Sequence, residues 1–222
     1  MNKAKIHTPY HLKDGTRVPS VTTALGELSK PALIPWAWGL GIKGLDYRTF
    51  RDELADVGSL AHRMILCHIK DETLSTDDFT PNQVSLAENC FLKYLEWERQ
   101  HKIEPIAVEE PMVSELWKYG GTPDFYGTID GLLTVMDFKT GKAIYEDYWY
   151  QIGAYGWLVK EKYGMDFLNY RILNIGRDET EKFVEEQRTG LTREFEIFIS
   201  ALHIYQLKKA PKKEDPVVGR PS

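Results

Sequence analysis

Two carboxylates and a lysine lie close together near the middle of this chain. Asp124 ends the segment Gly-Gly-Thr-Pro-Asp, and Asp137 and Lys139 lie in the segment Asp-Phe-Lys-Thr-Gly-Lys. Carboxylate oxygens are the usual ligands of hard divalent cations, which can neutralise a phosphate and activate water. A lysine ammonium can stabilise the charge that develops during the reaction. These residue types therefore suit hydrolysis of a phosphodiester.

The elements between these residues are predicted to bring them together. Two predicted strands, 117–128 and 132–138, flank the Asp-Gly dipeptide at 130–131, which is a strong signal for a tight turn. A hairpin returns the chain close to its start. Asp124 and Asp137 can therefore converge on one ion.

Other nearby groups can add to this site. Alternate residues of a strand share a face, so Lys139 points the same way as Asp137 and can orient water. The backbone carbonyl of Phe138 is a further candidate ligand. Glu109 or its neighbour Glu110, on the preceding predicted strand, can add a carboxylate, although a solvated strand face is the alternative. A solvated turn also explains many isolated Asp-x-Lys patterns, so the neighbouring motifs decide between the two explanations.

The composition is that of an ordinary globular protein. The chain has 222 residues, of which 42% are hydrophobic and 27% are charged. The net charge of −5 counts mildly against a nucleic-acid partner without excluding one, because local patches matter more than totals. Only two cysteines occur, Cys67 and Cys90, which favours a reducing compartment. We see no signal peptide or membrane-spanning stretch and expect a cytoplasmic protein.

The hydrophobic periodicity and the turn signals predict a mixed α/β core. We expect one domain over 1–210, with its core at about 81–176, and a flexible tail at 211–222. The predicted helices are a short one capped by Ser20, a core-packing segment at 31–45, and helices at 49–70, 81–101, 145–163 and 191–209. The predicted strands are a hairpin at 10–18 and strands at 105–114, 117–128, 132–138, 168–175 and 182–187.

The residues of the central site resemble the PD-(D/E)xK nuclease superfamily, specifically its RecB-like exonuclease branch. Pro123-Asp124 matches the "PD" element, and Asp137-Phe138-Lys139 matches the "(D/E)xK" element. The resemblance runs from about residue 18 to residue 175.

Two further motifs of that branch are present in the expected order. Gly58 and His62 match a Gly-x-x-x-His on an upstream helix, and Gln151 and Tyr155 match a Gln-x-x-x-Tyr on the helix after the lysine strand. Each motif alone is weak, and the four in order are fairly specific. A solvated turn does not explain them together.

The resemblance implies a restriction-endonuclease-like αβββαβ core with an N-terminal helical extension. It also implies a Mg²⁺- or Mn²⁺-dependent deoxyribonuclease, an exonuclease acting in phage-type DNA recombination, repair or processing. The implied catalytic residues are Asp124, Asp137 and Lys139. The implied metal ligands are His62, Asp124, Asp137 and the Phe138 carbonyl. Gln151 and Tyr155 are the implied supporting residues.

DNA is the implied partner, along a path that Lys118, Lys139, Lys142 and Arg171 could line. A separate annealing or helicase protein and a homo-oligomer remain open, and a phage protein would work in the host cytoplasm. Two cysteines exclude the four-cysteine iron–sulfur cluster of some relatives. Two other functions stay open: a non-catalytic DNA-binding or assembly protein that keeps the fold, and a carboxylate-pair hydrolase such as a glycosidase.

Overall fold

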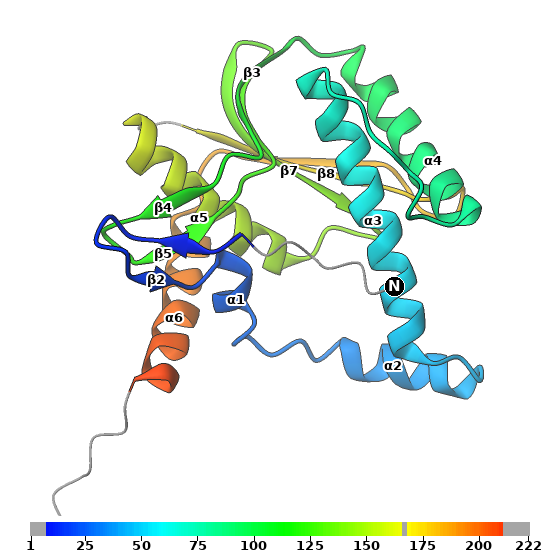
Figure 1. Ribbon diagram of the computed structural model, residues 1–222, viewed down its shortest axis with the longest axis horizontal. Helices are drawn as coiled ribbons and strands as arrows, with labels where there is room; N and C mark the ends of the chain where they lie inside the picture. The colour runs from blue at the N-terminus through cyan, green and yellow to red at the C-terminus, as the bar shows by residue number, and fades with distance from the viewer. Residues whose placement is uncertain (1–7, 166–167, 211–222) are drawn as a thin grey trace, which may run out of the picture.

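Residues 8–165 and 168–210 are described by a computed structural model, whose centre is a five-stranded mixed sheet (Figure 1). All neighbouring strands are antiparallel except β7 and β8, which are parallel. The strands, in spatial order, are β3 (Ile103–Val108), β6 (Phe125–Ile129), β7 (Leu132–Thr140), β8 (Asn169–Ile175) and β9 (Val184–Arg188). The predicted mixed α/β core is confirmed, and the tail predicted at 211–222 lies outside the described residues.

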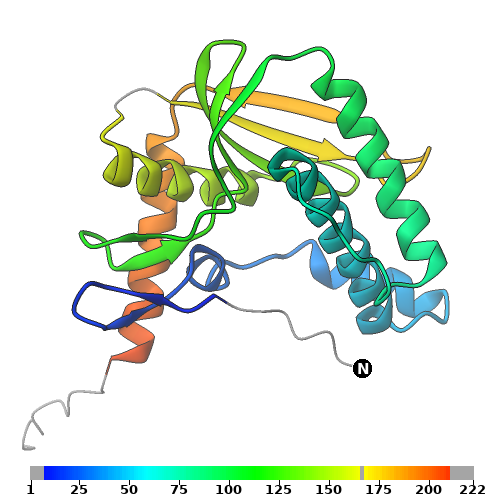
Figure 2. The same ribbon diagram turned by 45° about the horizontal axis from the view of Figure 1, so that its top comes forward.

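Helices cover both faces of this sheet (Figures 1 and 2). Alternate residues of β7 point to opposite faces: Val135 joins the cluster under α5 and α6, and Met136 joins the cluster under α3 and α4. By the same alternation, Asp137 and Lys139 lie on the α5 side. The covering helices are α3 (Tyr47–Lys70), α4 (Pro81–Glu98), α5 (Glu146–Tyr163) and α6 (Thr192–Lys209).

Local signals explain where these elements begin and end. The Thr80 side chain caps α4 through a reciprocal capping box with Gln83, and Pro81 occupies the first turn. Gly164 ends α5 in the left-handed conformation, at φ 70°. The predicted helices therefore appear at their expected places. In the described part of the chain, no helix has an apolar stretch long enough to cross a bilayer.

The N-terminal segment packs against a second, small sheet. The predicted hairpin and the Ser20 cap are confirmed, since Ser20 Oγ accepts the Thr23 backbone N–H at 3.0 Å. The ring of Tyr10 lies so close to Gly120 that any side chain there would overlap it. These elements are β1 (Tyr10–His11), β2 (Arg17–Val18) and α1 (Val21–Leu25), with β4 (Met112–Ser114) and β5 (Tyr119–Gly121) forming the small sheet.

Two of the predicted strands are wrong as single strands. The predicted strand 105–114 splits into β3 and β4 at Glu109, whose φ of 52° breaks the ladder. The predicted strand 117–128 splits into β5 and β6 around Pro123, which has no N–H to donate. In both cases the chain passes from one sheet to the other.

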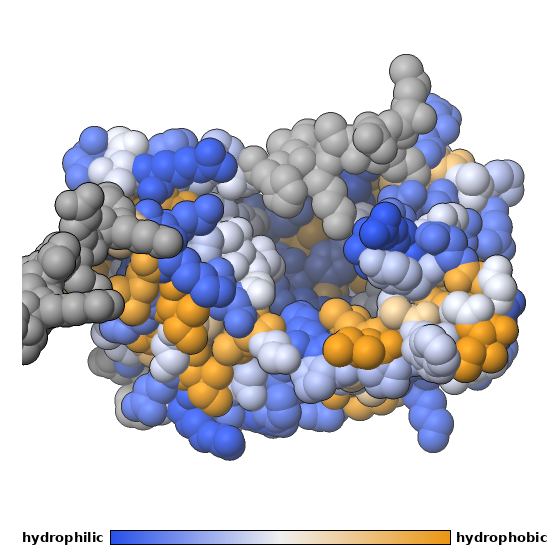
Figure 3. Space-filling view, turned by 90° about the horizontal axis from the view of Figure 1, so that it is seen from below, coloured by the Kyte–Doolittle hydropathy of each residue, from blue (hydrophilic) through white to orange (hydrophobic). Residues whose placement is uncertain are grey.

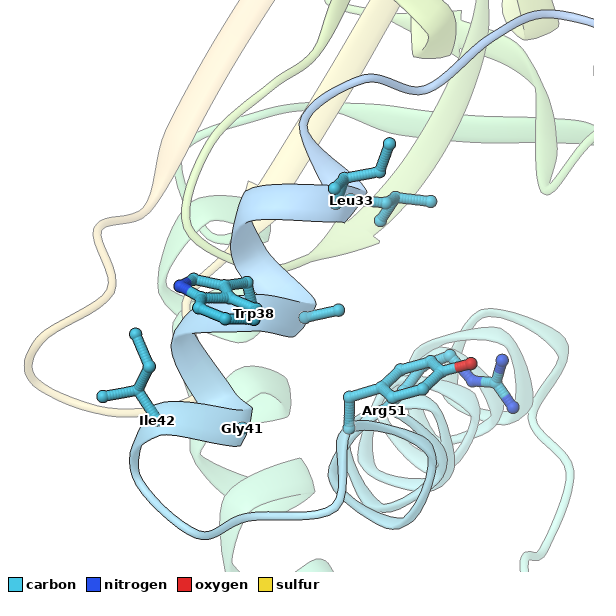
Figure 4. Close-up of a pocket in the computed structure, with 8 residues that line it drawn as sticks. Leu33, Trp38, Gly41, Ile42 and Arg51 are labelled. Atoms are coloured by element: carbon cyan, nitrogen blue, oxygen red, sulfur yellow. The ribbon is translucent and has the colours of Figure 1, made fainter.

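The predicted core role of the tryptophan-rich segment is also wrong. It forms α2 (Leu33–Ile42), in which only Leu40 is buried, while Trp38 is 72% exposed. Hydrophobic side chains gather on the surface on this side of the molecule (Figure 3). Leu33, Trp38 and Ile42 line a shallow pocket, with Arg51 of α3 across from them (Figure 4). A hydrophobic sequence therefore does not place α2 in the core.

The predicted apolar face of α4 is offset by about one position. The periodicity predicts an apolar face of Val84, Ala87, Phe91, Leu95 and, less regularly, Trp97 or Glu98. Ala87 and Trp97 are buried, whereas Val84, Phe91 and Leu95 are only partly buried at the edge of the cluster. The centre of the face consists of Ala87, Cys90, Tyr94 and Trp97.

Gly58 lets α3 approach the end of β7 closely. A Cβ on Gly58 would lie 2.7 Å from Thr140 Oγ1, which is closer than real Cβ contacts. The helix that carries His62 therefore rests against the strand that carries Lys139.

This contact predicts that Gly58→Ala destabilises the natural chain and stabilises a chain that lacks the Thr140 hydroxyl. An alanine in place of glycine normally stabilises a helix interior by up to about 1 kcal/mol. We expect Gly58→Ala to lower the free energy of unfolding of the natural chain by about 1 kcal/mol, because either the Thr140 side chain or α3 must shift to relieve the overlap. In a Thr140→Ala background, the same substitution should stabilise the protein. Urea denaturation measures both, and equal effects in the two backgrounds would contradict the contact.

Candidate active site

The register of the β6–β7 hairpin brings the two aspartates together. Phe125 pairs with Met136, so Asp124, immediately before β6, lies opposite Asp137. Asp124 Oδ2 accepts the backbone N–H of Phe138 at 2.8 Å. The convergence predicted from the hairpin is therefore what the structure shows.

His62 reaches the same point from α3. Its Nε2 lies 2.5 Å from the carbonyl oxygen of Phe138 and 3.5 Å from Asp124 Oδ2. The edge of one ring faces the other, with the centroids of His62 and Phe138 5.8 Å apart. Three of the four predicted ligands thus meet at the end of β7, although they are far apart in sequence.

Lys139 is held by a chain of polar contacts on the α5 side. Its Nζ lies 2.5 Å from Asp137 Oδ2 and donates to Gln151 Oε1 at 3.1 Å. Gln151 Nε2 donates in turn to the hydroxyl of Tyr155 at 2.9 Å. The ring of Tyr148 lies 5.1 Å from the ammonium. The Gln-x-x-x-Tyr motif therefore fixes the position of the lysine.

Burial makes the negative charge of Asp124 unfavourable at this site. Asp137 is only 1% exposed. Burial raises the pKa of Asp124 to about 6, His62 opposes that rise, and the neighbouring charge of Asp137 adds to it. Burial and the same Asp137 charge also raise the pKa of Tyr155 well above its usual range. His62 and Lys139 therefore compensate the two carboxylates only in part.

The donor types fit a hard divalent cation. Two carboxylates, an imidazole and a backbone carbonyl match Mg²⁺ or Mn²⁺ in kind, and the uncompensated charge of Asp124 favours a cation there. Within residues 8–165 and 168–210, no three His, Cys, Asp or Glu side chains are already arranged as a metal site. Lys139 occupies one oxygen of Asp137, so the ammonium must move for a cation to use that oxygen.

Glu109 is not among the residues that the structure brings together. Its Oε2 accepts the Lys70 ammonium at 3.0 Å, and its side chain is 45% exposed. The neighbouring Glu110 pairs with Lys162 and Tyr163. Both carboxylates therefore lie on a solvated face, as in the alternative explanation. Glu109 contacts Asp124 through its backbone, whose N–H donates to the Asp124 carbonyl oxygen.

One residue of the predicted DNA path is wrongly placed. Arg171 is 4% exposed, lies against the ring of Trp97 and pairs with Glu185 at 2.6 Å. It therefore cannot line a surface path. Lys118 and Lys142 are exposed, in the turn between β4 and β5 and in the segment after β7 respectively.

Two residues near the site were not predicted. The hydroxyl of Tyr10 bonds Thr122 Oγ1 at 2.7 Å, two positions before Asp124, and no sequence pattern linked these residues. Asn174 pairs in register with Lys139 across β7 and β8 and is fully buried. A polar residue within an apolar strand was an available signal for Asn174.

Comparisons with known proteins give a fold and no sequence relationship. No model of a protein family matches the chain, and no curated protein matches it in sequence. A crystal structure from Eubacterium rectale, named "Putative exonuclease", superposes with a TM-score of 0.50 at 10% identity, over 68% of this chain. The chain spans 65% of that protein's length. The structure of SSO0001 gives a TM-score of 0.32 at 13% identity, over 71% of this chain and 75% of that one.

The first superposition defines the class of fold. This chain has a mixed α/β fold of nuclease-like type, with a five-stranded mixed sheet flanked by helices. At 10% identity the likeness extends to the fold alone.

The raised pKa of Asp124 predicts a pH-dependent stability. The folded state binds this proton more tightly than the unfolded chain, whose carboxyl has its ordinary pKa of 3.8. The favourable contribution is therefore complete below about pH 4 and is lost as the pH rises through about 6. Asp124→Asn keeps an acceptor for the Phe138 N–H and removes the charge. At pH 8, we expect the Asp124→Asn variant to be more stable than the natural chain, with a free energy of unfolding higher by on the order of 2 kcal/mol.

At pH 4, the free energies of unfolding of Asp124→Asn and the natural chain should be nearly equal. Urea denaturation with EDTA at both pH values measures them without bound metal. A variant that is less stable than the natural chain at pH 8 would contradict the buried, uncompensated charge.

Proposed function

We propose that this chain is a divalent-metal-dependent deoxyribonuclease, an exonuclease of the RecB-like branch of the PD-(D/E)xK superfamily. The observation that carries this is the meeting of Asp124, Asp137, Lys139 and His62 at one end of β7. Two further observations support the proposal. The four sequence motifs occur in the family's order, and the fold resembles that of a protein named as an exonuclease.

The residues of this chain take distinct roles in the proposal. His62, Asp124, Asp137 and the Phe138 carbonyl would hold Mg²⁺ or Mn²⁺. When bound, such an ion neutralises the phosphate and lowers the pKa of the attacking water. Lys139 orients that water or stabilises the developing charge.

Gln151 and Tyr155 act as positioning residues for Lys139. Gln151 accepts from the ammonium, and the Tyr155 hydroxyl fixes the orientation of the Gln151 amide. A well-placed ammonium matters because small misplacements of a reacting group lower rates steeply.

The biological setting is part of the same proposal. We infer a phage-type role in DNA recombination, repair or processing, with a separate annealing or helicase protein as partner. A cytoplasmic site of action agrees with Cys67 and Cys90, which are free thiols.

A nuclease assay tests the function directly. With Mg²⁺, the natural chain should shorten linear DNA and leave closed circular DNA intact, and EDTA should abolish the activity. Lys139→Ala should lower kcat by about 100-fold or more, the size expected for losing a group that stabilises transition-state charge. Lys102→Ala is the matched control, because Lys102 is an exposed lysine that pairs with Glu104 and takes no part in the proposed site or DNA path.

Equal cleavage by Lys139→Ala and the natural chain would contradict the assignment. Binding of DNA without any cleavage would favour the non-catalytic alternative, and full activity in EDTA would favour a metal-free hydrolase. A duplex and a single strand, each labelled at one end, give the polarity and the strand preference.

Tyr155→Phe isolates the positioning role. The substitution removes one hydroxyl and keeps the buried ring, so the Gln151 amide loses its fixed orientation while the core stays filled. We expect kcat to fall by about tenfold with little change in KM, because the lost contact acts in the transition state. A change in KM alone, measured by steady-state kinetics, would place Tyr155 in substrate binding instead.

A further inference from the structure

Asn174, near the end of β8, has a buried amide oxygen without a partner. Its side chain is fully buried, and its Nδ2 donates to the Gly141 carbonyl at 2.9 Å. Its Oδ1 accepts no hydrogen bond from any residue that the structure describes. Buried polar atoms are rarely left unpaired, so this oxygen calls for an explanation.

The register places this oxygen beside the catalytic lysine. Lys139 pairs with Asn174 in the parallel β7–β8 ladder, and paired residues of neighbouring strands point to the same face. Both side chains therefore lie on the face that α5 covers. The oxygen lies on the Gly141 side, where a Cβ on Gly141 would come within 3.9 Å of it. It is thus beyond Lys139, toward the carboxyl end of β7.

The Lys139 ammonium can donate one more hydrogen bond, and it would lose its contact with Asp137 if a cation bound there. The ammonium has three N–H groups. It forms an ion pair with Asp137 Oδ2, which accepts no hydrogen bond from the described residues, and it donates a hydrogen bond to Gln151 Oε1. A divalent cation bound to Asp137 would repel the ammonium from the first of these. Gln151 stays fixed by Tyr155, so the ammonium keeps that contact and needs a replacement for the other.

We propose that Asn174 is a positioning residue, whose Oδ1 receives the Lys139 ammonium when a divalent cation binds Asp137. The move carries the ammonium toward the carboxyl end of β7, where the Asn174 amide lies beside Gly141. Asn174 thereby lowers the competition between lysine and cation for Asp137. This role rests on the proposed metal-dependent function and adds a residue that none of the four motifs contains.

Calorimetric titration with MnCl₂ alone, without DNA, tests the role in the full chain. Asn174→Leu should weaken the Kd for Mn²⁺ by about tenfold, because the lysine then stays on Asp137. In a Lys139→Met background, Asn174→Leu should leave the Kd unchanged. Asn169→Leu is the matched control, an asparagine on the same strand that pairs with Thr134, at the opposite end of β7.

Two outcomes would overturn the role. One is an unchanged Kd in Asn174→Leu, and the other is an equal weakening in both lysine backgrounds. If the natural chain binds no Mn²⁺, the proposed function itself fails, and the role of Asn174 fails with it. Thermal unfolding without metal shows whether each variant is folded, and the smaller Asn174→Ser replaces Asn174→Leu if that variant is not.

Discussion

The pairing of β6 with β7 is the constraint on which the rest of the site depends. It sets Asp124 opposite Asp137, and the bond from the Phe138 N–H to Asp124 Oδ2 locks that arrangement. A slip of one residue would turn every side chain of β7 to the other face. Lys139 would then point to α3 and α4 and lose its contact with Gln151, so one register determines both the carboxylate pair and the lysine.

The site is held together at an electrostatic cost. Two carboxylates lie buried beside each other, and burial, with the charge of Asp137 adding to it, raises the pKa of Asp124. Buried charges of this kind destabilise a fold unless they are paired. The protein keeps them because the flanking helices fix the partners: α3 supplies His62 and α5 supplies Gln151. Such strain at one place is the usual mark of a functional site.

Much of the fold could be predicted from local signals. The turn at residues 130–131, the Ser20 cap and the glycine that ends α5 each act through the backbone of a few neighbours. The central aspartates and the lysine were predictable for the same reason, because a single hairpin brings them together. His62 was predictable only through its motif, since nothing local to α3 shows that it faces β7.

The errors share a physical cause, which is that tertiary contacts override local pattern. Hydrophobic alternation continues through Glu109, but a positive φ there transfers the chain to another sheet. The apolar α2 has the composition of a core helix and meets too little of the fold to be buried. Asn174 and Tyr10 reach the site region through strand register and through a contact between segments 112 residues apart. The contact of Tyr10 leaves no pattern in a single sequence, and Asn174 is marked there only as a polar residue within an apolar strand.

The central claim is that Asp124, Asp137, His62 and the Phe138 carbonyl form one cation site. Anomalous diffraction from crystals soaked in MnCl₂ tests it most directly, because manganese is located without reference to activity. The account predicts an anomalous peak bounded by the two aspartates and the Phe138 carbonyl, with the Lys139 ammonium displaced from Asp137. A fully soaked crystal with no peak there, and with Lys139 still on Asp137, would contradict it.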